Sequence, residues 1–195
     1  MRSFKTKELV GTAVLTAVVI VLQLCGSFIR FGGFSVSLVL LPIVVGSAMY
    51  GAFSGAWLGL VFGFTVLLSG DAALFLAIDP LATFGMVLVK GTAAGLVAGL
   101  VYRAASRLNR TAATFAAAFI CPVVNTGIFL IGCRLFFLDA IAAMAQSFGF
   151  EGPVHLYLLT VFVGANFIFE LLFNMVLAPV VIRIVDIGKG MEKQS

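Results

Sequence analysis

The sequence predicts an all-α integral membrane protein: a compact bundle of six transmembrane helices with both termini in the cytoplasm. Three observations support this fold class. Of the 195 residues, 62% are hydrophobic and 10% are charged, and the mean hydropathy is +1.20. Apolar runs of membrane-spanning length fill the chain, and basic residues gather on one side of them. A soluble domain of this size could not bury so much apolar surface.

The apolar runs define the expected helices, because about 17–25 apolar residues cross a bilayer. They lie at 8–26, 36–50, 52–69, 82–104, 111–137 and 156–184. The second is the weakest, since it is short, contains Pro42 and leads almost directly into the third. No segment remains for a soluble domain, so residues 1–195 are expected to form a single six-helix transmembrane domain.

Basic residues predict the orientation. Six spans leave both termini on one side, and that side holds nine of the twelve Lys and Arg residues: Arg2, Lys5, Lys7, Arg103, Arg107, Arg110, Arg183, Lys189 and Lys193. Only Arg30 and Arg134 fall on the far side, so both termini are expected in the cytoplasm. The far-side connections are longer, acidic and rich in Phe, Leu and Ala, which predicts partly buried lids.

Small residues predict how the helices pack. Glycines recur every fourth residue in the third and fourth spans, at Gly51, Gly55, Gly59, Gly63, Gly91, Gly95 and Gly99. Such stripes allow two helix backbones to approach closely within a membrane. The first span carries an Ala13-x-x-x-Ala17 pair, which internal packing explains about as well as docking of another membrane subunit does.

Two ionisable residues lie inside the spans. A charge at the bilayer centre costs ~2.5–3.5 kcal/mol on insertion scales, so such residues face a cavity or a partner. Lys90 lies on the order of 12 Å below the outer end of its span, and Glu170 lies nearer the midplane. Asn166 and Asn174 stand one turn to either side of Glu170, so the three form one polar stripe.

These polar groups predict an outward-facing pocket for a polar small molecule. Asn125 reaches a similar depth beside Pro122, whose helix kink suggests a cavity wall. Trp57 and phenylalanines are candidates for apolar contacts. Arg30 and Arg134 at the outer mouth would favour an anionic ligand. An alternative is that Lys90 and Glu170 pair with each other while the asparagines tie helices together, and both interpretations can hold at once.

The sequence lacks the motifs of several other functions. It contains no G-x-x-x-x-G-K-[ST] nucleotide loop, no evident cofactor motif and no cluster of metal ligands. The one histidine, His155, lies in an outer connection, so no serine has an intramembrane base to activate it. The basic residues flank apolar runs and form no nucleic-acid-binding patch. We therefore expect a transport protein, not an enzyme, and its energy must come from an ion gradient or from partner subunits.

The chain resembles the substrate-binding S components of energy-coupling factor (ECF) transporters. The resemblance rests on "TAVLTA" in the first span, "FSVSLVLLPIVVGSAMYGAFSGAWLGLVFGF" in the next two, "GMVLVKGTAAGLVAGLVYR" in the fourth and "CPVVNTGIFLIG" in the fifth. It implies a six-helix vitamin-binding subunit of an ECF-type ABC importer in a bacterial-type cytoplasmic membrane. Its implied partners are a transmembrane coupling subunit, which contacts Ala13 and Ala17, and two ATPase subunits.

The resemblance also implies a mechanism and a substrate class. The subunit would capture a vitamin from outside, beneath the loop between its first two helices, and topple in the membrane to release it inside. The asparagine in "VVNTGIFLIG" is most similar to the pantothenate-type branch, and Lys90 could pair with the pantothenate carboxylate; riboflavin and thiamine precursors remain alternatives. An autonomous ion-coupled transporter or a structural membrane scaffold is the competing hypothesis.

Overall fold

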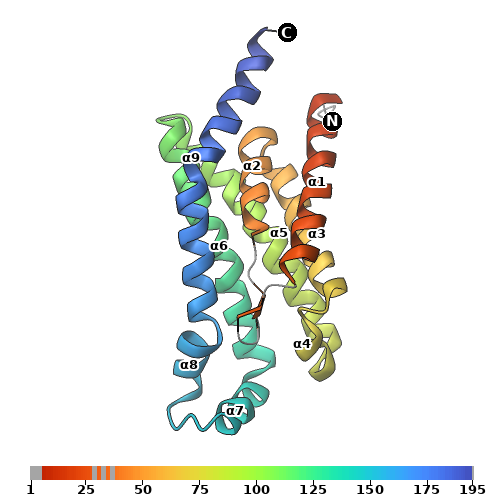
Figure 1. Cartoon of the computed structure of the whole chain (residues 1–195), viewed down its shortest axis with the longest axis vertical. Coiled ribbons are helices and arrows are strands. Elements are labelled where there is room, and N and C mark those ends of the chain that lie inside the picture. The colour runs from red at the N-terminus through yellow and green to blue at the C-terminus, as the bar shows by residue number, and fades with distance from the viewer. Residues whose placement is uncertain (1–5, 28–29, 32–33, 36–37, 195) are drawn as a thin grey trace.

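The computed structural model describes residues 6–27, 30–31, 34–35 and 38–194. Its helices run roughly side by side along one long axis (Figure 1). The elements are α1 (Thr6–Gly26), β1 (Arg30–Phe31), β2 (Phe34–Ser35), α2 (Leu40–Tyr50), α3 (Ala52–Ser69), α4 (Ala73–Ile78), α5 (Pro80–Ala105), α6 (Arg110–Phe136), α7 (Leu138–Ser147), α8 (Val154–Tyr157), the π-helical segment η1 (Leu158–Phe162) and α9 (Gly164–Gln194).

The predicted all-helical fold is present, but several elements differ from the expectation: the helix expected at 156–184 is divided into α8, η1 and α9 and extends to Gln194. Within the described residues, five helices are long and apolar enough to cross a membrane, and α2, at 11 residues, is a shorter apolar helix. It begins at Leu40 and not at position 36, because Pro42 suits a first helical turn, where its missing N–H is not needed. The sequence also did not predict the antiparallel pair β1–β2, in which Arg30 faces Ser35.

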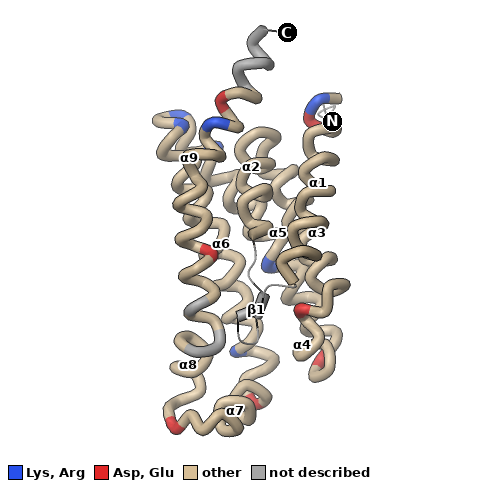
Figure 2. The backbone as a smooth tube through the Cα atoms, viewed as in Figure 1, with Lys and Arg blue, Asp and Glu red and all other residues tan. Residues whose placement is uncertain are grey.

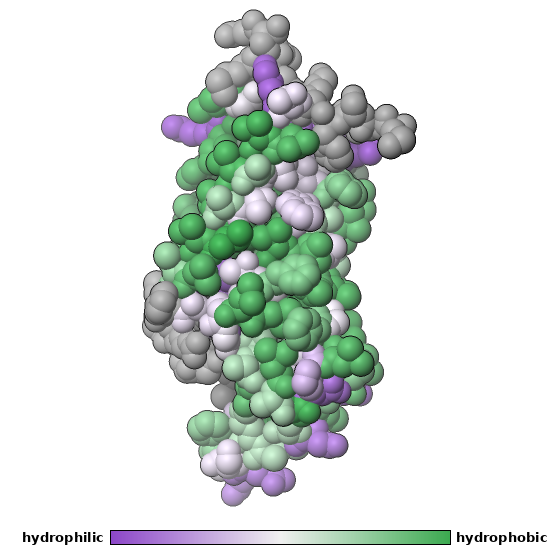
Figure 3. Space-filling view, turned by 90° about the vertical axis from the view of Figure 1, so that its right-hand side faces the viewer, coloured by the Kyte–Doolittle hydropathy of each residue, from purple (hydrophilic) through white to green (hydrophobic). Residues whose placement is uncertain are grey.

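The two ends of the bundle differ in charge. The start of α1 and the end of α9 lie at the same end of the bundle (Figure 1). Lys and Arg predominate at that end and Asp and Glu at the other (Figure 2). On the face shown in Figure 3, most of the surface between the two ends is apolar. This distribution agrees with the expected orientation, which stays a prediction.

Capping residues and glycines set where the central helices begin and end. Asp79 accepts a hydrogen bond from the backbone N–H of Ala82 at 3.0 Å, and Pro80 occupies the first position of α5. Asn109 caps α6 in the same way, at 2.8 Å from the Thr111 nitrogen. Gly51 has φ of 94° between α2 and α3, a value that side-chain-bearing residues rarely adopt.

The glycine stripes form the closest helix contact in the bundle. A Cβ atom added to Gly59 would collide with the carbonyl oxygen of Gly91, and one added to Gly55 would collide with that of Gly95. The α3 and α5 backbones therefore touch directly, as the spacing predicts. We call this contact the glycine seam.

The connections that contain α4, α7 and α8, at the end away from the termini, are partly buried as expected, and the connection after α1 lies largely outside the described residues. Phe75 of α4 meets Phe129 of α6 and Phe137 edge to face, with ring centroids 5.5 and 4.9 Å apart. Ile141 of α7 and Tyr157 of α8 are also buried. These short helices close that end of the bundle over the interior.

Candidate functional site

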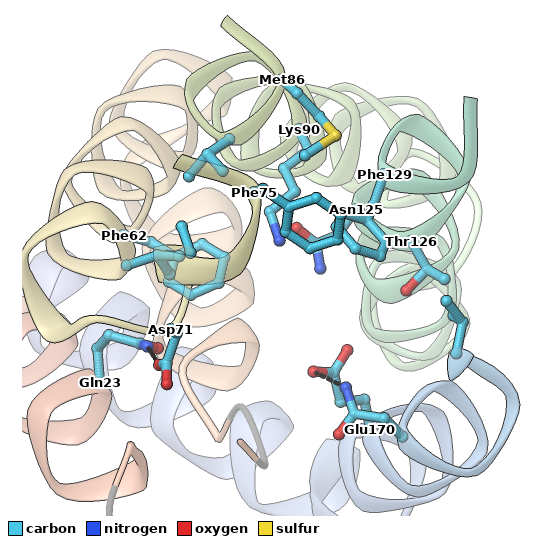
Figure 4. A pocket seen from close by; sticks show the side chains of 15 residues that line it. Gln23, Phe62, Asp71, Phe75, Met86, Lys90, Asn125, Thr126, Phe129 and Glu170 are labelled. Atoms are coloured by element: carbon cyan, nitrogen blue, oxygen red, sulfur yellow. Dashed lines mark hydrogen bonds between the residues drawn. The ribbon is translucent and has the colours of Figure 1, made fainter. Parts of the chain in front are cut away.

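A cavity of about 100 Å³ lies inside the bundle (Figure 4). Its polar lining comes from α1, the α3–α4 connection, α5, α6 and α9: Gln23, Asp71, Lys90, Asn125, Thr126, Asn166 and Glu170. Its apolar lining is Phe62, Val66, Ala72, Phe75, Met86, Val87, Phe129 and Val163. Four of the predicted site residues, Lys90, Asn125, Asn166 and Glu170, thus surround a single space.

Lys90 extends from α5 between two aromatic rings. Its Nζ atom lies 5.0 Å from the ring centroid of Phe129 and 5.8 Å from that of Phe62. Ring faces attract an ammonium group and partly replace its lost hydration. Among the described residues Lys90 forms no ion pair with Glu170, so the interpretation that these two residues pair directly is not the arrangement found.

Glu170 is held by its neighbours on α9. It is 3% exposed, and its Oε1 atom accepts a hydrogen bond from Asn166 Nδ2 at 3.2 Å. Asn174 Nδ2 donates to the Glu170 backbone carbonyl at 2.8 Å. Asn174 is fully buried and lies outside the cavity lining, so it acts within the helix packing.

Asn125 offers the cavity an acceptor without a partner. The residue is 5% exposed, one turn beyond Pro122 in α6, and its Oδ1 atom has no hydrogen-bond partner among the described residues. A buried polar atom left unsatisfied costs about 1–3 kcal/mol. A donor supplied by a bound molecule would remove that cost, which makes Asn125 a candidate ligand contact.

Three polar residues of the cavity, Gln23, Asp71 and Thr126, were not predicted as site residues. Gln23 of α1, 3% exposed, donates from Nε2 to Asp71 Oδ2 at 2.6 Å. The same carboxylate oxygen accepts from Ser69 Oγ at 3.1 Å. A glutamine within an apolar span was a usable signal for Gln23, whereas Asp71 follows the third span and resembled an ordinary loop residue.

The remaining expected contacts lie elsewhere. Arg30 belongs to β1, and its side chain falls outside the described part of the structure. Arg134 is exposed in the last turn of α6 and does not line the cavity. The expectation for Trp57 was wrong: it is 49% exposed and donates from Nε1 to Thr16 Oγ1 at 3.2 Å on the outer surface.

The small-residue pair of α1 lies on the outside of the bundle. Ala13 and Ala17 are exposed in this chain. Ala13 lines a shallow groove between α1 and α3 together with Leu9, Thr12, Thr16, Phe53, Ser54 and Trp57. Thr12 Oγ1 bridges the groove by donating to Ser54 Oγ at 3.2 Å.

Comparisons with known proteins identify the family. The family model described as "ECF transporter, substrate-specific component" matches residues 7–182, most of the chain. No curated protein and no solved structure matches the chain significantly. Within the described residues, no group of three His, Cys, Asp or Glu side chains could hold a metal ion. Members of this family are small-molecule-binding transporter subunits, not enzymes, and they work with a coupling component and ATPases. The chain is a multi-pass membrane protein that belongs to the family of ECF transporter substrate-specific components.

Proposed function

We propose that this subunit captures a vitamin, pantothenate, from outside a bacterial cytoplasmic membrane and delivers it inward. Its partners are a transmembrane coupling subunit and two ATPase subunits. Residues 1–195 act as one six-pass domain with both termini in the cytoplasm, and toppling of this domain releases the vitamin inside.

The observation that carries the proposal is the cavity. One ammonium, two carboxylates and three amides line a single space inside the bundle, and they come from four helices and the α3–α4 connection. Polar groups are costly at this depth unless they contact a partner, water or a ligand. The unpartnered Asn125 oxygen favours a ligand that donates a hydrogen bond.

Pantothenate suits this lining chemically. Its carboxylate can pair with Lys90, and its hydroxyl and amide groups can meet Asn125, Asn166 and Glu170. The cavity is smaller than the ~300–1,000 Å³ of typical ligand pockets, which favours a small, flexible substrate over a large ring system. Arg30 and Arg134 would attract the anion to the entrance.

The binding site can be tested with purified protein and labelled pantothenate. We expect Lys90→Ala and Asn125→Ala each to weaken binding at least about tenfold, ~1.4 kcal/mol. Lys7→Ala, a change at an exposed lysine of α1, is the matched control. Pantothenol, which carries an alcohol in place of the carboxylate, should bind the wild type and Lys90→Ala alike. Unchanged pantothenate affinity in both cavity variants would refute the site, and mass spectrometry of any copurifying molecule tests the substrate.

The energy source is tested through Ala13 and Ala17. Ala13→Trp should fill the α1–α3 groove and prevent assembly with the coupling subunit while leaving ligand binding intact. Leu100→Trp, at an exposed position of α5, is the control. Uptake into liposomes by this chain alone, driven by an ion gradient, would instead support an autonomous secondary transporter.

A further inference from the structure

The Gln23–Asp71 pair forms a second polar wall of the cavity. The two residues come from the end of α1 and from the α3–α4 connection, and both line the cavity. Figure 4 shows them across the opening from Glu170. The short 2.6 Å contact between Gln23 Nε2 and Asp71 Oδ2 makes this a firm attachment between two separate elements.

The carboxylate fixes which way the glutamine amide faces. Asp71 Oδ2 accepts from both Ser69 Oγ and Gln23 Nε2, so the Gln23 amide nitrogen must point toward it. The Gln23 carbonyl oxygen is thereby turned away from that carboxylate oxygen. No described residue donates a hydrogen bond to it, although Gln23 is nearly fully buried.

A second observation on a neighbouring wall points to the same ligand chemistry. The Asn125 Oδ1 atom is a buried carbonyl oxygen with no donor among the described residues. Together with the carboxylates of Asp71 and Glu170, the side-chain oxygens of Gln23 and Asn125 make the cavity rich in acceptors, and Lys90 is the one cationic side chain among its described lining residues. A buried acceptor atom without a hydrogen-bond donor destabilises the folded protein.

We propose that Gln23, oriented by Asp71, binds a hydrogen-bond donor of the transported molecule. The substrate is then a small molecule with O–H or N–H donors on at least two sides and an acceptor or anionic group at Lys90. Asp71 acts as a positioning residue, because it fixes the amide through which Gln23 meets the ligand. This inference rests on the proposed function and extends it to the substrate's donor groups.

The test is a binding cycle on purified full-length protein. Pantothenate, thiamine, riboflavin and biotin are titrated, and the one that binds is compared with an analogue in which one hydroxyl or N–H is replaced by hydrogen or methylene. Gln23→Leu should raise the dissociation constant of the parent at least about tenfold and that of the donor-lacking analogue less than about twofold. Gln146→Leu, at an exposed glutamine of α7, is the matched control.

The outcomes separate this inference from the proposed function. If a panel member binds and Gln23→Leu weakens parent and analogue equally, Gln23 is merely structural and the inference is overturned. If Gln23→Leu does not yield monodisperse protein, Asp71→Asn is the variant that tests the inference. The new amide at position 71 can donate a hydrogen bond to Gln23, so the Gln23 side chain can turn. An unchanged ratio of parent to analogue affinity in Asp71→Asn overturns the inference as well. If no panel member binds, the vitamin-binding function falls and this inference falls with it.

Discussion

Two of the cavity walls, the one formed by α5 and the one formed by α9, are built differently. The α5 wall, which carries Lys90, is in backbone contact with α3 through the glycine seam. The α9 wall, which carries Asn166 and Glu170, follows the π-helical segment and is organised by side-chain hydrogen bonds. Backbone contact allows little displacement, whereas a side-chain network can rearrange at small cost. We therefore expect the backbone beneath Lys90 to be the more rigid of the two, and the amide and carboxylate on α9 to adjust more readily to a ligand.

The π-helical segment is a further reason to expect the α9 wall to be adaptable. Val163 N donates to Leu158 O at 3.1 Å, a bond across five residues and not four. Such wider turns are uncommon and often occur at functional sites. Val163 and Asn166, which line the cavity, come directly after this turn. A small change in the turn would shift both side chains without disturbing the glycine seam.

The largest expected effect comes from breaking the glycine seam. Gly59→Ala places a methyl group against the Gly91 carbonyl, so α3 and α5 must separate beside Lys90. We expect the free energy of unfolding to fall by about 1–3 kcal/mol or more, measured by thermal unfolding in detergent. Gly85→Ala is the control, because a Cβ there meets nothing within 4 Å. Equal stability of the two variants would show that the seam is not rigid.

A smaller effect is expected from a change that keeps the charge on the α5 wall. Lys90→Arg introduces a broader group between Phe62 and Phe129, and α5 cannot move to accommodate it. Pantothenate affinity should fall about tenfold while the folded protein stays intact. Isothermal titration measures this. If Lys90→Arg binds pantothenate as tightly as the wild type does, the α5 wall is the adaptable one and the comparison is wrong.

The smallest effect is expected on the α9 wall. Asn166→Gln keeps the amide and lengthens the side chain by one methylene, which the wall following η1 should absorb. The dissociation constant for pantothenate should change less than about threefold, below ~0.7 kcal/mol. A loss as large as that in Lys90→Arg would mean that both walls are equally rigid.

The sequence predicted the interior polar residues better than the details around them. Lys90, Asn125, Asn166 and Glu170 lie in apolar runs, and lipid excludes such groups, so their convergence on the interior followed from chemistry alone. Trp57 did not follow, because an indole with one polar atom also suits an exposed helix face. Gln23 was not predicted as a cavity residue, because it carries no charge and lies near the end of its span. The π turn before α9 has no marker in the sequence.

The short α2 accounts for the interior space itself. The cavity is lined from α1, α3, α4, α5, α6 and the α9 side, and none of its described lining residues belongs to α2. Eleven residues rise about 16 Å, roughly half of the ~30 Å hydrocarbon thickness. The rest of that height is left to the segment before α2, which includes β1 and β2 (Figure 1). We expect that a chain in which α2 is about two helical turns longer would fill the interior space and no longer bind a ligand there.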